Sequence, residues 1–149
     1  MEIIGLIAEY NPFHKGHLYH INKIKELYPN SLIIAVISTT FTQRGEISIL
    51  NKWDKTTIAL ENNIDLVIEL PFIYATQSAD TFAHAALHIL NELKVEKIIF
   101  GSECNDINKL KEIANIQIKN KKFDQYVKDY LSKGNNYPTS LSLALKRLD

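Results

Sequence analysis

Apolar and polar positions alternate in blocks along the first hundred residues. Four short apolar runs have the length and composition of strands that are buried on both faces. They cover residues 3–8, 32–37, 66–70 and 95–100. Between them, the spacing of apolar residues predicts helices over residues 15–28, 52–61 and 78–93. Strands that alternate with helices imply right-handed crossovers and a parallel sheet, so we expect an α/β fold with a doubly wound, Rossmann-like parallel sheet.

The pattern changes after Gly101. Three further segments have helical spacing, and no fifth strand is predicted. They cover residues 108–118, 122–131 and 139–148. The sequence ends inside the last helical pattern, as a truncated chain would, and we expect the isolated chain to be incomplete. We expect one domain over residues 1–104 and a helical extension over residues 105–149.

The composition is that of an ordinary globular protein. Of the 149 residues, 46% are hydrophobic and 23% are charged, which excludes a wholly disordered chain. No apolar run reaches the ~18–20 residues of a membrane span, and no leader with a cleavage site is found. The single cysteine, Cys104, has no second cysteine with which to form an internal disulfide. We therefore expect a reduced, cytoplasmic protein that does not bind a membrane.

The zero net charge hides an uneven distribution. Residues 1–103 contain 8 basic and 12 acidic side chains, whereas residues 104–149 contain 9 basic and 5 acidic ones. Only the C-terminal part would attract a polyanion electrostatically.

The strongest candidate for chemistry is the segment over residues 11–17, which reads NPFHKGH. It follows the first predicted strand and opens the first predicted helix, where free N–H groups can bind phosphate. His14 and His17 are three residues apart and can face one ligand, while Gly16 would let a phosphate or a ribose approach the backbone. Two imidazoles there can donate hydrogen bonds to phosphate oxygens whose charge grows in a transition state.

Two other interpretations of this histidine pair are open. The histidines could cap the helix without binding any ligand, or they could ligate zinc, since His-x-x-His occurs at zinc sites. No third metal ligand stands out nearby in the sequence. We favour a nucleotide site without a resident metal over both.

Five blocks of sequence, in order, carry a specific resemblance to a known family. They cover residues 5–18, 41–46, 65–72, 77–80 and 100–103, and a weaker match continues through residues 136–138. Together they resemble the bacterial tRNA(Met) cytidine acetate ligases of the HxGH nucleotidyltransferase superfamily. The resemblance implies that ATP activates acetate to acetyl-adenylate, with Mg²⁺ as cofactor. The acetyl group would then pass to N4 of the wobble cytidine of elongator tRNA(Met).

The resemblance also implies which residues bind ATP and that His14 and His17 are catalytic. The implied ATP-binding residues are Ile7, Ala8, Glu9, Tyr10, Asn11, Pro12, Phe13, His14, Lys15, Gly16, His17, Leu18, Tyr19, His20 and Gly101. The expected topology agrees, because a fourth strand beside the first would place Gly101 and the His14 loop on either side of one crevice. For Gly101 the alternative is a plain turn glycine, and Lys15 could simply be solvated.

Arg44 is the candidate for a second anion contact. It follows the second predicted strand, so its loop opens at the same sheet edge, and its planar guanidinium suits a carboxylate or a phosphate. It could hold acetate or the tRNA, or lie in an ordinary surface loop. We also expect Glu69 to bond to a backbone group or to Arg44, Trp53 to lie in the core, and His84 and His88 to lie on a solvated helix face.

One feature departs from the superfamily pattern. Members of the superfamily have a second phosphate-binding motif, an Arg or Lys segment after a fifth strand. This motif does not occur before Asp149. Two other functions stay open, the first because it shares the HxGH motif and the second because the other phosphate-binding motif is missing. One is an adenylyltransferase for a small phosphorylated cofactor precursor, which would need a basic pocket although residues 1–103 are net acidic. The other is a non-catalytic nucleotide- or RNA-binding module.

Overall fold

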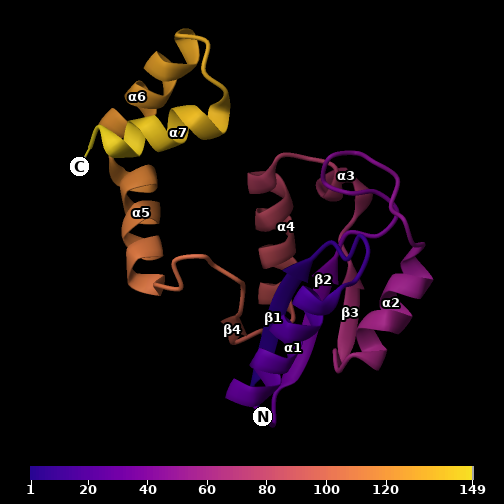
Figure 1. The fold of residues 1–149 in the computed structure, drawn as a ribbon. Helices are drawn as coiled ribbons and strands as arrows, with labels where there is room; N and C mark the ends of the chain where they lie inside the picture. Colours follow the sequence, from indigo (N-terminus) through magenta and orange to yellow (C-terminus); the bar gives the residue numbers. More distant parts are fainter. Residues whose placement is uncertain (149) are drawn as a thin grey trace. The chain divides into compact units, whose positions relative to one another are not determined.

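The structure, a computed structural model, describes residues 1–148 and divides the chain into two compact units (Figure 1). The first unit covers Met1–Gly101, and the second begins at Ser102. Among the described residues, no helix is both long and apolar enough to cross a membrane.

Four parallel strands form the sheet of the first unit, in the order β3-β2-β1-β4. Their bounds are β1 Ile3–Ala8, β2 Leu32–Ile37, β3 Leu66–Glu69 and β4 Lys97–Ile98. The sequence predicted β1 and β2 to the residue but made β4 too long. As an edge strand, β4 pairs with β1 through Lys97 and Ile98 alone. One ladder hydrogen bond flanks this pairing on each side, from Glu96 N–H to Ile3 O and from Ile99 N–H to Gly5 O.

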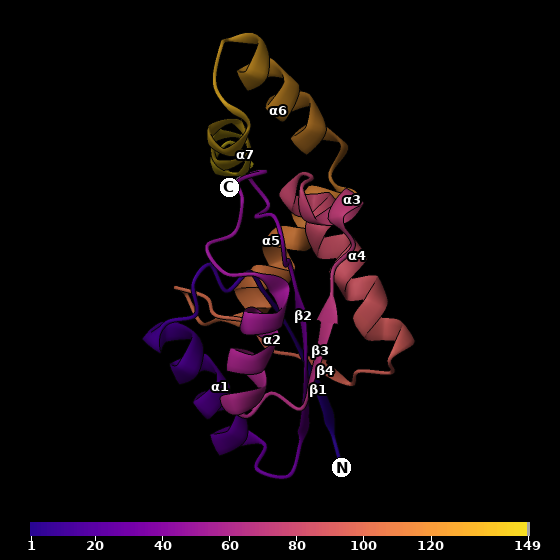
Figure 2. The same ribbon diagram turned by 90° about the vertical axis from the view of Figure 1, so that its right-hand side faces the viewer.

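Helices cover both faces of the sheet, so the doubly wound α/β prediction is confirmed. Figure 2 shows α1 and α2 on one face and α3 and α4 on the other. Their bounds are α1 Lys15–Leu27, α2 Lys52–Glu61, α3 Phe72–Ala75 and α4 Ala79–Glu92. Side-chain caps define several starts: the Asn51 side chain accepts hydrogen bonds from the N–H groups of Trp53 and Asp54 at α2. The sequence pattern missed α3 because a single helical turn is too short to show a period.

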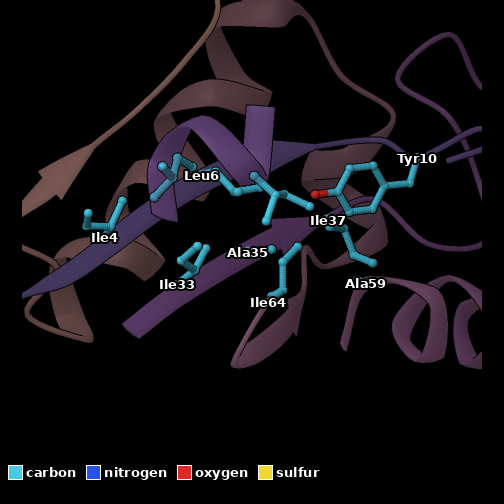
Figure 3. Packing of buried hydrophobic residues seen from close by; sticks show 10 residues of the cluster. Ile4, Leu6, Tyr10, Ile33, Ala35, Ile37, Ala59 and Ile64 are labelled. Atoms are coloured by element: carbon cyan, nitrogen blue, oxygen red, sulfur yellow. The ribbon is translucent and has the colours of Figure 1, made fainter. Parts of the chain in front are cut away.

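The side chains of the strands alternate between two apolar clusters. Ile4 and Leu6 of β1 face α1 and α2, together with Ile33, Ala35 and Ile37 of β2. Figure 3 shows this cluster, with Tyr10 beside Ile37 and Ala59. The side chains on the opposite face pack against α3 and α4. The buried tyrosine thus connects this core to the loop that follows β1.

Gly5 allows α4 to approach β1 closely. A Cβ atom at this position would lie 2.9 Å from both Leu90 Cδ1 and Val95 Cγ1, which is too close for carbon atoms. Only glycine therefore fits without a shift of the neighbouring side chains.

The second unit is helical, as predicted. Its helices are α5 Ile107–Lys119, α6 Lys121–Ser132 and α7 Tyr137–Lys146. Phe123 and Val127 of α6 pack against Ala144 of α7 and form a small core of their own. Pro138 lies in the first turn of α7, where its missing N–H costs no helical hydrogen bond.

Candidate functional site

Two histidines cap the N-terminus of α1 by accepting hydrogen bonds from nearby backbone N–H groups. His14 is the N-cap residue, and its Nδ1 accepts a hydrogen bond from the Gly16 N–H at 3.0 Å. In return, His17 Nδ1 accepts from the His14 N–H at 3.2 Å. This is the geometry of a capping box, with histidines in the two positions usually held by Ser or Thr and by Glu or Gln.

These caps fix the tautomer of both rings. An Nδ1 atom that accepts a hydrogen bond cannot carry a proton, so each neutral imidazole must carry its proton on Nε2. The two rings stack with their centroids 3.7 Å apart and an interplanar angle of 23°. The pair therefore presents two Nε2–H donors from one compact position at the helix start.

The environment keeps His17 neutral. Burial lowers its pKa to about 4, and the nearby His14 and His20 act in the same direction. Burial also lowers the pKa of His20, which lies next to the backbone of Ile99. The buried Nε2 of His20 has no hydrogen bond of ordinary geometry among residues 1–148. Because the pKa of His17 is about 4, this ring is uncharged at neutral pH and acts as a neutral hydrogen-bond donor.

Gly16 makes room for the ring of its neighbour. A Cβ atom at Gly16 would lie 2.9 Å from His14 Cε1 and 3.0 Å from His14 Nδ1. We expected this glycine to let a ligand approach the backbone, but in the structure the His14 ring lies against it and occupies its N–H. The Gly16 N–H is therefore taken up by the helix cap and is not free to bind a ligand.

Tyr10 and Phe13 support the His17 ring. Tyr10 is 2% exposed and has a φ of +48°, an uncommon conformation for a residue other than glycine. Its ring lies edge-on to Phe13 at 5.0 Å and to His17 at 4.8 Å, measured between centroids. Burial raises the pKa of the Tyr10 hydroxyl. We infer that this residue shapes the loop by packing.

The loop after β1 is bonded to the loop after β2. The Glu9 carboxylate accepts hydrogen bonds from the Gln43 N–H and the Ser38 hydroxyl. Asn11 Oδ1 accepts from the Ile49 N–H at 2.7 Å and from the Ser48 hydroxyl at 3.0 Å. The sequence analysis placed Glu9 and Asn11 in the site but did not foresee these bonds, because they join residues more than 25 positions apart.

Lys55 of α2 is a buried cation that the sequence analysis missed. The residue is 1% exposed, and its Nζ donates to the backbone oxygens of Glu9 at 2.9 Å and Ser38 at 3.2 Å. Burial lowers its pKa, against an opposing effect of the Glu9 charge. The sequence contained one indication of this burial: Lys55 lies four residues before the buried Ala59 and therefore on the same face of α2.

Arg44 lies at an exposed turn in the loop after β2. The Gly45 N–H donates to the Thr42 oxygen at 2.9 Å, and Gly45 has a φ of +79°, which favours glycine. No carboxylate within residues 1–148 forms an ion pair with Arg44. The Arg44 side chain is exposed, and its role in acetate or tRNA binding stays a prediction.

Two expectations about nearby residues were wrong. Glu69 does not pair with Arg44: it accepts from the Thr39 hydroxyl and from Lys52 Nζ, and the Thr39 hydrogen bond is the main cause of its lowered pKa. Trp53 is 71% exposed instead of buried, because it lies in the first turn of α2 on the side away from the sheet, next to the Lys52 ammonium.

The histidines of α4 line a groove. His84 and His88 lie there together with Asp80 and with Tyr74 of α3. Within the described part of the chain, no three His, Cys, Asp or Glu side chains are grouped closely enough to hold a metal ion.

Gly101 lies just beyond β4, the neighbour of β1 in the sheet. The chain order reverses between these two strands, and ligands of open α/β sheets bind beyond the carboxyl ends at such a point. The residue is exposed, with no atom within 4 Å of an added Cβ. The expected placement of the fourth strand beside the first is confirmed, whereas a contact of Gly101 with nucleotide stays a prediction.

Comparison with known proteins assigns the family. The model of a family described as HIGH Nucleotidyl Transferase matches residues 1–149. The chain belongs to this nucleotidyltransferase family. Two curated relatives are named tRNA(Met) cytidine acetate ligase. The protein from Caldicellulosiruptor saccharolyticus is 49% identical over 99% of this chain and 37% of its own length. The protein from Fusobacterium nucleatum is 50% identical over 96% of this chain and 36% of its own length.

Solved structures of Thermotoga maritima TmcAL have the same fold. The apo form matches with a TM-score of 0.91 and 39% identity, over 99% of this chain and 36% of the other. A second form, bound with alpha-thio ATP, matches with a TM-score of 0.89, 39% identity and the same coverage. This chain therefore spans little more than a third of the length of the relatives it matches.

Proposed function

We propose that this chain carries the ATP-binding site of a tRNA(Met) cytidine acetate ligase. The observation that carries the proposal is the pair of Nε2–H donors on His14 and His17, fixed by backbone caps at the helix that follows β1. Support also comes from the names of the relatives and from the ATP analogue bound to the T. maritima protein. In this proposal residues 7–20 and Gly101 line the nucleotide crevice between the ends of β1 and β4.

The proposed first reaction is the activation of acetate. A carboxylate oxygen of acetate attacks the α-phosphorus of ATP in line, an acetyl-adenylate forms, and pyrophosphate leaves. Acetate is already ionised at neutral pH, so this step needs no general base. The two Nε2–H groups would donate hydrogen bonds to phosphate oxygens as charge builds up on them. In the second step, the N4 amine of the wobble cytidine attacks the acetyl carbonyl carbon, and AMP leaves.

Mg²⁺ is expected to arrive with the nucleotide. The described residues form no cluster of three ligating side chains, and Oε2 of the Glu9 carboxylate accepts two hydrogen bonds. This donor set suits the usual case in which Mg²⁺ keeps several waters and is held by substrate phosphates. When bound, the ion would neutralise phosphate charge, while the histidines and the loop after β1 orient the triphosphate.

Isotope exchange between pyrophosphate and ATP tests the proposal. It is measured on this chain and on the full-length relative from C. saccharolyticus, with and without acetate. Acetate-dependent exchange in the relative and calorimetric ATP binding by this chain are expected. Exchange that requires a phosphorylated cofactor precursor would instead support the adenylyltransferase alternative. ATP binding without any exchange, in either protein, would support a non-catalytic binding module.

A further inference from the structure

Lys55 has no role in the proposed chemistry, yet its burial requires an explanation. Lysine is almost never fully buried unless its charge is compensated. Here the side chain is 1% exposed, and among the described residues no carboxylate forms an ion pair with it. Its hydrogen-bond partners are two backbone oxygens, those of Glu9 and Ser38.

Those two oxygens have equivalent places in the sheet. Glu9 is the first residue after β1, and Ser38 is the first residue after β2. Both carbonyls therefore lie at the carboxyl edge, next to the loop that begins the candidate nucleotide site. Lys55 reaches both from the buried face of α2, so a single ammonium group joins the two strand ends.

The carbonyl contacts have an electrostatic consequence. Backbone oxygens carry partial negative charge, and oxygens directed at a triphosphate would repel it. Lys55 binds both oxygens and places one positive charge next to them, close enough to the Glu9 carboxylate for the two charges to interact. Such a charge matters most where water is excluded.

We propose that Lys55 is a positioning residue for ATP: it holds the Glu9 and Ser38 carbonyls so that the loop after β1 accepts the triphosphate. This inference rests on the proposed ATP site. The Glu9 and Asn11 side chains also hold this loop, by accepting hydrogen bonds from the Gln43 and Ile49 N–H groups. Lys55 differs from these contacts in supplying charge as well as geometry.

Three variants of the 149-residue chain test this role by calorimetric titration with ATP. Lys55→Met removes the charge and both hydrogen bonds and is expected to weaken ATP binding at least about tenfold, the size of effect typical of losing a hydrogen bond made by a charged group. Lys55→Arg keeps a charged donor and is expected to restore most of the affinity. Lys52→Met is the matched control: it removes an exposed lysine from the same helix and is expected to bind ATP like the unmodified chain.

A measurement on the unmodified chain covers the case in which Lys55→Met does not fold. In a sample with ¹⁵N-labelled lysines, the Nζ resonance of Lys55, assigned from the Lys55→Arg spectrum, is expected to shift on ATP addition more than that of Lys52. An unshifted Lys55 resonance at ATP saturation would overturn the inference, as would unchanged affinity in a folded Lys55→Met chain. If the unmodified chain bound no ATP, the proposed function itself would be wrong. That outcome differs from ATP binding that does not depend on Lys55, which would overturn only the present inference.

Discussion

Asparagine substitutions can separate the two tasks of His14. Asparagine is among the best N-cap residues, and its Oδ1 can take the place of His14 Nδ1 as acceptor for the Gly16 N–H. It is too short to replace the distal Nε2–H. His14→Asn therefore keeps the helix cap and removes the donor, whereas His14→Ala removes both.

The expected magnitudes follow from these contacts. A hydrogen bond to a charged phosphate contributes about 1.5–3 kcal/mol, so losing one donor should weaken ATP binding roughly 10- to 150-fold. His14→Ala should lose the same affinity and, in addition, about 0.5–2 kcal/mol of folding stability through the lost cap. Because the His14 and His17 rings stack, the effects of a double His14→Asn, His17→Asn variant should not be additive.

Calorimetric ATP titration and thermal unfolding of the same samples measure both tasks. His14→Asn should melt near the unmodified chain but bind ATP weakly, and His14→Ala should be impaired in both respects. If His14→Asn bound ATP within about twofold of the unmodified chain, its loss would be far below that of a hydrogen bond to a charged group. The Nε2–H of His14 would then not contact phosphate, and the assignment of this histidine would fail.

Two further predictions concern pH and the Arg44 loop. The pKa of His17 is about 4 in the folded chain and about 6.5 when unfolded, so the unfolded chain binds more protons between these values. The free energy of unfolding should therefore fall as pH drops from about 6.5 to 4. In urea unfolding, the His17→Asn chain should lack this part of the pH dependence. An equally steep change of the free energy of unfolding with pH in both chains would contradict the prediction. In a full-length relative that has an arginine at the position of Arg44, its replacement by Lys should lower tRNA acetylation sharply while ATP binding survives, because lysine lacks the bidentate fork. Full acetylation by that variant would reduce Arg44 to a surface residue.

Local pattern was sufficient to predict most of the fold. β1 and β2 are central strands buried on both faces, so their apolar runs coincide with the pairing of the two strands. At the sheet edge the apolar run predicted a strand longer than β4 is, because only two of its residues pair with β1 and other apolar residues there contribute to packing alone. Trp53 shows a different limit. Its hydrophobic side chain suggested burial, but its position in the first turn of α2 leaves it exposed.

The sequence predicted where the candidate site lies, but not how its side chains pack and which backbone groups they contact. The histidine spacing and the position after a buried strand indicated where a nucleotide would bind. That Gly16 accommodates a histidine ring, however, depends on side-chain packing that no spacing rule contains. Lys55 was missed for the same kind of reason. A lysine on a helix usually reaches water, and only the meeting of two strand ends beneath α2 gives it buried partners.

Neutral histidines suit this position better than lysines would. The first turn of a helix carries a partial positive charge of about half a unit, so two ammonium groups there would repel both the helix and each other. Imidazoles avoid this cost when uncharged, and the burial that lowers the pKa of His17 keeps that ring neutral. The same caps that satisfy the helix start direct the remaining proton of each ring to Nε2. The His17 ring can thus donate to phosphate as an uncharged group, while the positive charge near this loop is that of Lys55, bonded to the Glu9 and Ser38 oxygens.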